Sequence, residues 1–408
     1  MVYAAIMGHG VVGSGVAEIL IKHPDRIKEH IKDELEVKYI LDLRDFPQLD
    51  YSDKFIKDFN TILNDPEIKI VAEAMGGTEP AYSFEKALLK AGKSVVTSNK
   101  ELVAAKGAEL LAIAAENNVN FLFEASVGGG IPILRPMAQC LAANEIKSVT
   151  GILNGTTNYI LNKMIVENMS FDDALRLAQE KGYAEKDPTA DIEGHDACRK
   201  ICILASLGFG RHVYPEQVKT EGITGITATD VEYADSLGYV IKLIGRAQKL
   251  KSGKICASVR PTLVSRENIL SDVNGVFNAI MVNGDETGDV MFYGRGAGKA
   301  PTASAVVADV IDCAKHLTAR KYLFWEDGSP DYVTEADLRV RLYVYAKSSD
   351  YDSLIESSAV AFPDLDGIIK NSRSGEIAFI TDEGLESQLR ERISSIKADS
   401  IKVMHTLS

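Results

Sequence analysis

The most constraining feature of the chain is the glycine pattern G-x-G-x-x-G near the N-terminus, formed by Gly8, Gly10 and Gly13. The pattern directly follows the apolar run VYAAIM, which predicts a short buried strand, and it opens GHGVVGSGVAEILIKH, which predicts a helix that stops at Pro24. In that context Gly8 allows a tight turn, Gly10 lets the backbone approach a pyrophosphate, and Gly13 allows close packing of the helix. The turn therefore predicts a dinucleotide site, and we expect Val12 within it to contact the cofactor.

Strand and helix patterns alternate through the first third of the chain. Apolar runs at residues 37–42, 69–77, 93–98 and 119–126 predict strands, and the last three are separated by helical patterns. Such alternation is typical of parallel βαβ units. It predicts an α/β fold with a doubly wound, Rossmann-type sheet.

A chain of 408 residues is too long for a single core, so two or three domains are expected. We assign residues 1–134 to the dinucleotide-binding domain, 135–300 to an α+β domain and 301–325 to a helix that returns to the nucleotide domain. Within the α+β domain, the stretch 231–249 predicts a helix. Residues 338–408 show the order βαββαβ, which predicts a small ferredoxin-like domain.

The composition excludes several classes of function. A formal net charge of −13 argues against nucleic-acid binding, which requires an excess of Lys and Arg. The apolar run at the N-terminus is too short to span a membrane and has no basic leader, so we expect neither a membrane segment nor a signal peptide. The five cysteines are scattered, which favours free thiols and a reduced, cytoplasmic setting.

Two further segments of the first domain carry polar candidates for the cofactor site. Asp42 ends the second predicted strand, where a carboxylate would accept hydrogen bonds from a ribose and favour NAD, whereas Arg44 could hold the 2′-phosphate of NADP. Thr97, Ser98 and Lys100 lie at the end of a later strand, where ligands of open α/β sheets bind. We expect either NAD or NADP as the cofactor.

The segment EKDPTADIEGHDACRK, residues 185–200, is unusually acidic and ends in a basic pair. Asp196 and Lys200 are four apart on a predicted helix and can therefore pair on one face. On a solvated helix such a pair contributes little, and composition alone favours a solvated acidic loop. Inside a cleft, the carboxylate would hold the ammonium group in place, where it could donate a proton.

The stretch AQEKGYAEKDPTADIEGHDACRK, residues 178–200, closely resembles the pattern of the homoserine dehydrogenase family. The segments GILNGTTNYIL, VVTSNKELVA, EASVGGGIP and ADSLGYVIKLIGRA also resemble that family, and the resemblance spans roughly residues 2–320. It implies a reversible, NAD(P)-dependent interconversion of L-aspartate 4-semialdehyde and L-homoserine. The same resemblance implies a homodimer or higher homo-oligomer that assembles through the α+β domain, which also binds the substrate.

The resemblance also implies roles for individual residues. Lys200 would stabilise the charge on the carbonyl oxygen and deliver the proton, with Asp196 orienting it and Lys100 assisting from the nucleotide side. A substrate with an α-ammonium group needs carboxylate partners, which accounts for the acidic segment. The implied substrate-binding residues are Gly155, Thr156, Tyr183, Glu185 and Asp191.

The segment EASVGGGIP has two interpretations. The resemblance implies a monovalent cation, Na⁺ or K⁺, held by oxygens of Glu124, Val127, Gly129 and Ile131, while the alternative is a glycine-rich hinge. The resemblance also places Gly294 and Gly296 near the cofactor.

The C-terminal segment departs from the family's regulatory pattern. Its element order is that of an ACT-like domain, but AKSSDYDS stands where an Asp-x-Pro-Gly turn is usual, so amino-acid feedback through this domain is not expected. Two alternatives for the whole chain are an oxidoreductase of sugars or other amino acids, and a catalytically inactive nucleotide-sensing regulator. The intact pattern at residues 178–200 argues against both.

Overall fold

The computed structural model describes residues 1–318, 323–329, 332–363, 365 and 367–408. The chain folds into two compact units, each built from several stretches of sequence. The first unit contains Met1–Val149, Cys202–Glu216 and Ile280–Ser329, and the second contains Thr150–Ile201, Gln217–Ala279 and Pro330–Ser408. The finer domain division given above stays a prediction. Within the described ranges, no helix is both long and apolar enough to cross a membrane.

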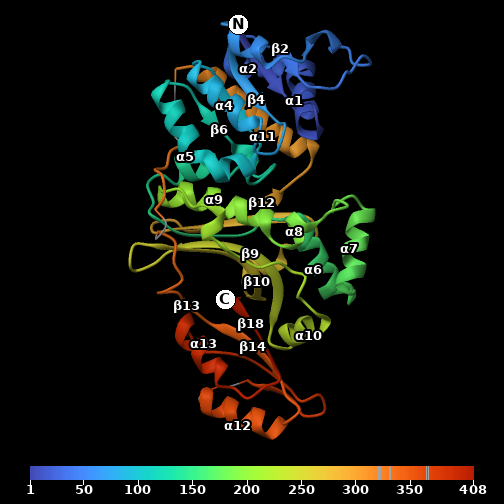
Figure 1. Cartoon of the computed structure of the whole chain (residues 1–408), viewed down its shortest axis with the longest axis vertical. Coiled ribbons are helices and arrows are strands. Elements are labelled where there is room, and N and C mark those ends of the chain that lie inside the picture. The colour runs from blue at the N-terminus through green and yellow to red at the C-terminus, as the bar shows by residue number, and fades with distance from the viewer. Residues whose placement is uncertain (319–322, 330–331, 364, 366) are drawn as a thin grey trace. The chain divides into compact units, whose positions relative to one another are not determined.

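The first unit is built on a six-stranded sheet with the order β3-β2-β1-β4-β5-β6 (Figure 1). All its strand pairs are parallel. This is the strand order of a dinucleotide-binding Rossmann sheet, so the predicted fold class is confirmed. The strands are β1 (Val2–Met7), β2 (Leu35–Leu41), β3 (Phe55–Ile56), β4 (Ile68–Glu73), β5 (Ser94–Thr97) and β6 (Phe121–Leu122).

Six helices accompany this sheet in the first unit's described part. They are α1 (Val11–Lys22), α2 (Pro24–Ile31), α3 (Phe59–Asn64), α4 (Ala81–Lys90), α5 (Lys100–Glu116) and α11 (Lys299–Lys315). The chain ends α1 at Lys22 and starts α2 at Pro24, because proline lacks the N–H needed inside a helix but suits its first turn. The late helix α11 contacts both α1 and β4, so residues distant in sequence complete this unit.

The second unit combines helices with strands of a mixed sheet. Its helices before the C-terminal segment are α6 (Gly155–Glu167), α7 (Phe171–Glu180), α8 (Thr189–Ile192) and α10 (Ala228–Ser236), and its strands are β8 (Lys219–Thr220), β9 (Tyr239–Lys249) and β10 (Ile255–Ser265). Strands β7 (Ile146–Ile152) and β11 (Phe277–Gly284) and helix α9 (His195–Phe209) each have residues in both units, and β12 (Gly288–Arg295) belongs to the first.

The predicted helix at residues 231–249 is wrong in its second half. Helix α10 ends at Ser236, Gly238 takes a φ of +81°, and the chain continues as β9. A left-handed glycine ends a helix readily, and the following YVIKLI is rich in the β-branched and aromatic residues that favour strands. Pairing of β9 with β10 along eleven residue pairs then outweighs the helical pattern.

The C-terminal segment has the predicted βαββαβ order, with two short strands, β13 and β17, added as a separate pair. Its elements are β13 (Arg339–Val340), β14 (Leu342–Lys347), α12 (Tyr351–Ala361), β15 (Ile369–Asn371), β16 (Glu376–Ile380), β17 (Gly384–Leu385), α13 (Glu386–Ser394) and β18 (Ser400–Leu407). The four main strands lie in the order β18-β14-β16-β15. Helices α12 and α13 pack on this sheet (Figure 1), and Leu354, Leu389 and Ile393 belong to one buried apolar cluster with Leu342 and Phe379.

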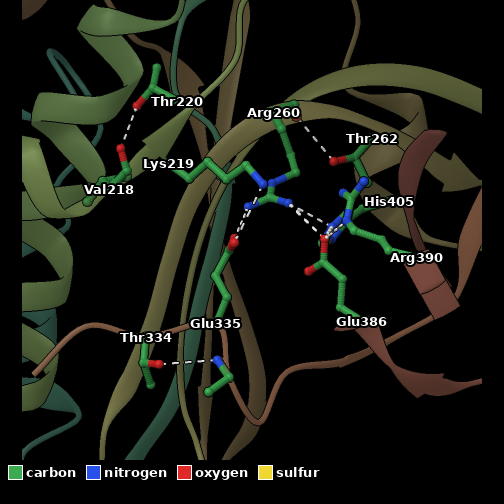
Figure 2. Close-up of polar contacts among 11 residues, drawn as sticks. Val218, Lys219, Thr220, Arg260, Thr262, Thr334, Glu335, Glu386, Arg390 and His405 are labelled. Atoms are coloured by element: carbon green, nitrogen blue, oxygen red, sulfur yellow. Dashed lines mark hydrogen bonds and ion pairs between the residues drawn. The ribbon is translucent and has the colours of Figure 1, made fainter. Parts of the chain in front are cut away.

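This C-terminal sheet is continuous with β10, because β18 pairs with β10 in parallel. Figure 2 shows a charged group at that junction, here called the Arg260 cluster: Arg260, Glu335, Glu386, Arg390 and His405. Arg260 contacts His405 at 2.7 Å and pairs with Glu335, while Arg390 donates to Glu386 at 2.7 Å. Burial raises the pKa of Glu386, but His405 and Arg390 outweigh that effect and lower it to about 2. The cluster thus ties the C-terminal segment to β10 by buried ion pairs.

Candidate active site

The glycine turn of the first unit has the geometry that its sequence predicts. Gly8 takes a φ of +88°, which favours glycine, and a Cβ on Gly13 would lie 1.9 Å from the Gly8 carbonyl oxygen. Helix α1 begins beyond Gly10 without a side-chain cap, so its first N–H groups can point to an anion. A Cβ on Gly10 would meet no described atom within 4 Å, which leaves room for a ligand there.

Asp42 and Arg44 lie beside this turn and are paired with each other. Asp42 Oδ2 accepts from the His9 backbone N–H at 2.7 Å, and Asp42 Oδ1 accepts from Arg44 Nε at 2.9 Å. The Arg44 guanidinium also reaches Oδ2 at 2.9 Å, and this hydrogen bonding holds the pKa of Asp42 well below its usual range. Asp42 is therefore ionised, and its oxygens are already engaged by Arg44 and the glycine turn.

A pocket of about 520 Å³ opens at this turn. Gly8, Gly10, Asp42 and Arg44 line it, as expected for a cofactor site. The sequence reasoning missed the remaining lining residues, which are Leu41, Leu43, Lys57, Phe59, Ala74, Met75, Gly76, Pro80 and Phe84. The rings of Phe59 and Phe84 stack with their centroids 3.9 Å apart and give the pocket a flat apolar wall.

The TSNK segment occupies the carboxyl end of β5, as predicted. The Thr97 side chain is fully buried and donates to Glu73 Oε2 at 2.5 Å, so its hydroxyl serves an internal contact. Ser98 donates its backbone N–H to the Glu73 carbonyl at 3.4 Å. Asn99 caps α5 by accepting from Leu102 N, which makes Lys100 the first residue of that helix. The cofactor roles of Thr97, Ser98 and Lys100, and of Val12 in α1, stay predictions.

The lysine–carboxylate pair of the acidic segment lies within the second unit and is buried. Lys200 Nζ donates to Asp196 Oδ2 at 2.7 Å and to the Leu153 carbonyl at 2.8 Å. The side chains of Lys200 and Asp196 are only 7% and 6% exposed, so the solvated-loop interpretation is wrong for this pair. The pKa of the nearby Asp191 is raised, first by burial and then by the negative charge of Asp196.

Asn154 joins these carboxylates and was missed by the sequence reasoning. Its Nδ2 donates to Asp191 Oδ1 at 2.7 Å and to Asp196 Oδ2 at 2.9 Å. Its Oδ1 accepts from Thr157 N and caps α6. An asparagine directly before a helix start is a recognisable capping signal, and it could have pointed to this residue.

The other predicted substrate residues lie on α6 and on the loop after α7. Thr156 Oγ1 donates to the Tyr183 carbonyl at 2.7 Å, which joins the two segments. A Cβ on Gly155 would lie 2.7 Å from the Val276 carbonyl oxygen, so only glycine fits there. Tyr183 is 44% exposed, and Glu185 is exposed, with its backbone carbonyl accepting from the Gln179 side chain at 3.0 Å. The Glu185 carboxylate is thus accessible to a ligand.

Glu124 in the glycine-rich segment is buried and already accepts three backbone N–H groups. Its Oε1 accepts from Ile133 at 2.6 Å and Leu134 at 2.8 Å, and its Oε2 accepts from Arg135 at 2.8 Å. A carboxylate offers about four lone pairs, so Oε2 keeps capacity for one more contact. The described residues contain no cluster of three or more His, Cys, Asp or Glu side chains suited to a metal. An oxygen site for a monovalent cation would therefore depend on backbone carbonyls.

Gly294 and Gly296 pack against this same segment within the first unit. A Cβ on Gly129, whose φ is +57°, would lie 2.4 Å from the Gly296 carbonyl oxygen, and one on Gly294 would lie 3.1 Å from the side chain of Ile131. Gly130 donates its N–H to the Arg295 carbonyl at 3.1 Å. The structure thus brings these two predicted glycine regions together, and their cofactor role stays a prediction.

A Rossmann-type unit with an open glycine turn, in one chain with a buried lysine held by a carboxylate, defines a dinucleotide-dependent oxidoreductase. A family model described as "Homoserine dehydrogenase, NAD binding domain" matches residues 8–124, and one described as "Homoserine dehydrogenase" matches residues 132–311. The chain belongs to the homoserine dehydrogenase family.

Individual relatives agree with this family assignment. A homoserine dehydrogenase of Synechocystis sp. is 47% identical over 320 residues, which are 77% of this chain and 73% of that protein. The crystal structure of a homoserine dehydrogenase from Thiobacillus denitrificans has a TM-score of 0.88 at 34% identity and covers 99% of this chain and 98% of its own. A hyperthermophilic archaeal homoserine dehydrogenase mutant in complex with NADPH has a TM-score of 0.66 at 31% identity, covering 76% and 97%.

Proposed function

We propose that the chain catalyses the reversible, NAD(P)-dependent interconversion of L-aspartate 4-semialdehyde and L-homoserine. The observation that carries this proposal is the buried Lys200–Asp196 pair, joined through Asn154 to a further carboxylate, Asp191. A catalytically inactive sensor would have no need of an ammonium group desolvated in this way. The family membership of the chain supports the same reaction.

The mechanism assigns the proton to Lys200. When bound, the reduced nicotinamide supplies the hydride that attacks the aldehyde carbon. Lys200 Nζ faces the developing negative charge on the carbonyl oxygen, stabilises it and gives it a proton. The hydrogen bonds from Nζ to Asp196 and to the Leu153 carbonyl hold the ammonium group in a fixed direction. In the reverse direction the same amine accepts the proton of the homoserine hydroxyl.

Asp191 and Glu185 are assigned to the substrate's α-ammonium group. Asp191 accepts a hydrogen bond from the Asn154 amide at 2.7 Å. This amide is neutral, so it does not balance the negative charge of an ionised Asp191. Glu185 is exposed and carries a second carboxylate on the same acidic segment. Gly155, Thr156 and Tyr183 complete the proposed substrate site from α6 and the adjoining loop.

The pocket at the glycine turn supports a dinucleotide, and its charged pair is compatible with both forms. Asp42 suits the ribose hydroxyls of NAD, and Arg44 suits the 2′-phosphate of NADP once it leaves Asp42. Lys100 is assigned a supporting role from the first unit. For a monovalent cation, the carbonyls of Val127, Gly129 and Ile131 and the remaining lone pair of Glu124 form an oxygen donor set suited to Na⁺ or K⁺.

Steady-state kinetics test the proposal directly. The purified chain is assayed with aspartate semialdehyde and either NADH or NADPH, with and without added KCl, and with a sugar aldehyde as the control substrate. We expect turnover of the semialdehyde with at least one cofactor and none of the sugar. A protein that binds NAD(P)H but turns over no semialdehyde would refute the proposed activity. Light scattering tests the expected homodimer.

A further inference from the structure

Two buried carboxyl groups of the first unit have no part in the proposed chemistry. Glu73 ends β4 and Glu85 lies in the middle of α4, and both side chains are fully buried. Neither oxygen of Glu85 has a hydrogen-bond partner among the described residues. A buried carboxylate without partners is strongly unfavourable, so this position requires an explanation.

Glu73 differs from Glu85 because it gathers several donors. Its Oε1 accepts from the backbone N–H groups of Met75 at 2.6 Å and Gly76 at 3.3 Å, and its Oε2 accepts from Thr97 Oγ1 at 2.5 Å. Burial raises the pKa of Glu73, and these three donors act against that effect because they favour its ionised form.

The same network reaches the end of β5 and the start of α5. Thr97 Oγ1 accepts from Asn99 N at 2.9 Å, and Asn99 Nδ2 donates to the Gly77 carbonyl at 2.6 Å. Gly76 and Gly77 take φ values of +79° and +72°, a left-handed backbone that would be strained for other residues. Met75 and Gly76 also line the 520 Å³ pocket, so Glu73 holds one wall of the proposed cofactor site.

Burial, followed by the charge of Glu73, raises the pKa of Glu85 well above its usual range. Glu73 is the charged side chain that acts on Glu85, while Tyr82 and Lys86 of α4 form a separate cluster with Glu109. Two adjacent buried carboxyl groups cannot both ionise at moderate cost, so they share one proton. The proton belongs on Glu85, which lacks the donors that Glu73 has.

We propose that Glu85 is a positioning residue, a neutral acid that supports the Glu73 carboxylate and thereby holds the loop 74–77 and the start of α5 in the form that binds the cofactor. In this proposal the protonated Glu85 carboxyl donates a hydrogen bond to Glu73, the side chain whose charge acts on it. The expected effect on cofactor affinity rests on the proposed use of a dinucleotide, whereas the shared proton and the order of the loop do not.

Two variants separate the proton from the donor. Glu85→Gln keeps the size and a donor but cannot ionise, and Glu85→Leu removes both the donor and the acid. Unfolding of the cofactor-free protein is measured in urea between pH 5.5 and 8.5. Between the ordinary pKa of a glutamate and the raised pKa of Glu85, the folded parent holds a proton that unfolding releases. The unfolding constant of the parent should therefore rise about tenfold per pH unit relative to Glu85→Gln, up to the raised pKa.

The loop is followed by amide hydrogen exchange of the peptide that covers residues 74–80, without cofactor, and by titration with NADH and NADPH. At pH 7 we expect parental exchange and parental Kd for Glu85→Gln, and several-fold faster exchange and weaker binding for Glu85→Leu. Parallel stability curves for parent and Glu85→Gln would overturn the shared proton. Parental exchange in Glu85→Leu would overturn the positioning role, even if the protein binds no dinucleotide. If Glu85→Leu does not fold, exchange of the same peptide is compared between parent and Glu85→Gln above the raised pKa of Glu85. There the parent alone ionises and should exchange faster, and equal exchange would overturn the positioning role.

Discussion

Replacing Lys200 with methionine separates the structural and chemical roles of the buried pair. Methionine retains most of the apolar stem but removes the ammonium group, which leaves the Asp196 carboxylate, 6% exposed, without its cation. Breaking a buried ion pair costs about 3–5 kcal/mol of unfolding free energy. Asn154 still donates to Asp196 Oδ2 at 2.9 Å, so we expect the lower end, about 3 kcal/mol.

The effect on catalysis is expected to be separate and larger. Loss of a proton donor lowers turnover by ~10²–10⁴-fold. Adding Asp196→Asn removes the unpaired charge, so the double variant should recover most of the lost stability while turnover stays low. NAD(P)H affinity should be unchanged in both proteins, because the glycine turn belongs to the other unit.

The assay combines urea unfolding with semialdehyde-dependent oxidation of NAD(P)H. Turnover of Lys200→Met within a few-fold of the parent would remove Lys200 from proton transfer. A double variant as unstable as the single one would show that the unpaired Asp196 charge does not cause the loss of unfolding free energy. Either result would refute part of the reasoning from this cluster.

Three other positions and one truncation give sharp expectations. Gly13→Ala should abolish dinucleotide binding in calorimetry, because its Cβ would lie 1.9 Å from the Gly8 carbonyl oxygen; near-parental Kd would refute this. Glu185→Gln should raise KM for homoserine several-fold with little change in cofactor KM, and an unchanged homoserine KM would exclude it from the site. KM for homoserine should rise as pH falls through the raised pKa of Asp191, because the ionised form binds the ammonium; a KM that stays flat from pH 8 down to the acid limit of folding would contradict this. Truncation before Leu338 should give an unstable protein, because β10 would lose its pairing with β18, and Arg260 would lose its partners Glu386 and His405. A fully stable truncated chain would contradict this.

The features that followed from sequence are those determined by local spacing. The glycine turn depends on three positions within six residues, and the Lys200–Asp196 pair depends on a spacing of four in a helix. Both were found in the expected geometry. Local patterns of this kind survive folding because the backbone alone brings the residues together.

Contacts between distant segments were beyond the sequence. Nothing in the local pattern shows that Glu73 would meet Thr97, or that Arg260 would meet His405 of the last strand. A partial signal existed for Glu85, because Ala81, Glu85 and Leu88 have the spacing of one helix face and that face is buried. A charged residue on such an apolar stripe indicates either a paired or a neutral side chain, but the sequence does not identify its partner.

The buried carboxylates of this chain are stabilised in three different ways, and the difference bears on function. Glu124 is surrounded by backbone N–H groups, and Asp196 is neutralised by Lys200. Glu85, we infer, keeps its proton. Asp191 differs from these, since its 2.7 Å contact is with a neutral amide. Burial and the charge of Asp196 raise its pKa, and the charge of Lys200 offsets only part of that rise. A partly desolvated carboxylate in that situation gains most from an added cation. A positively charged ligand would therefore stabilise the ionised form of Asp191, as the proposed binding of an amino acid's α-ammonium group requires.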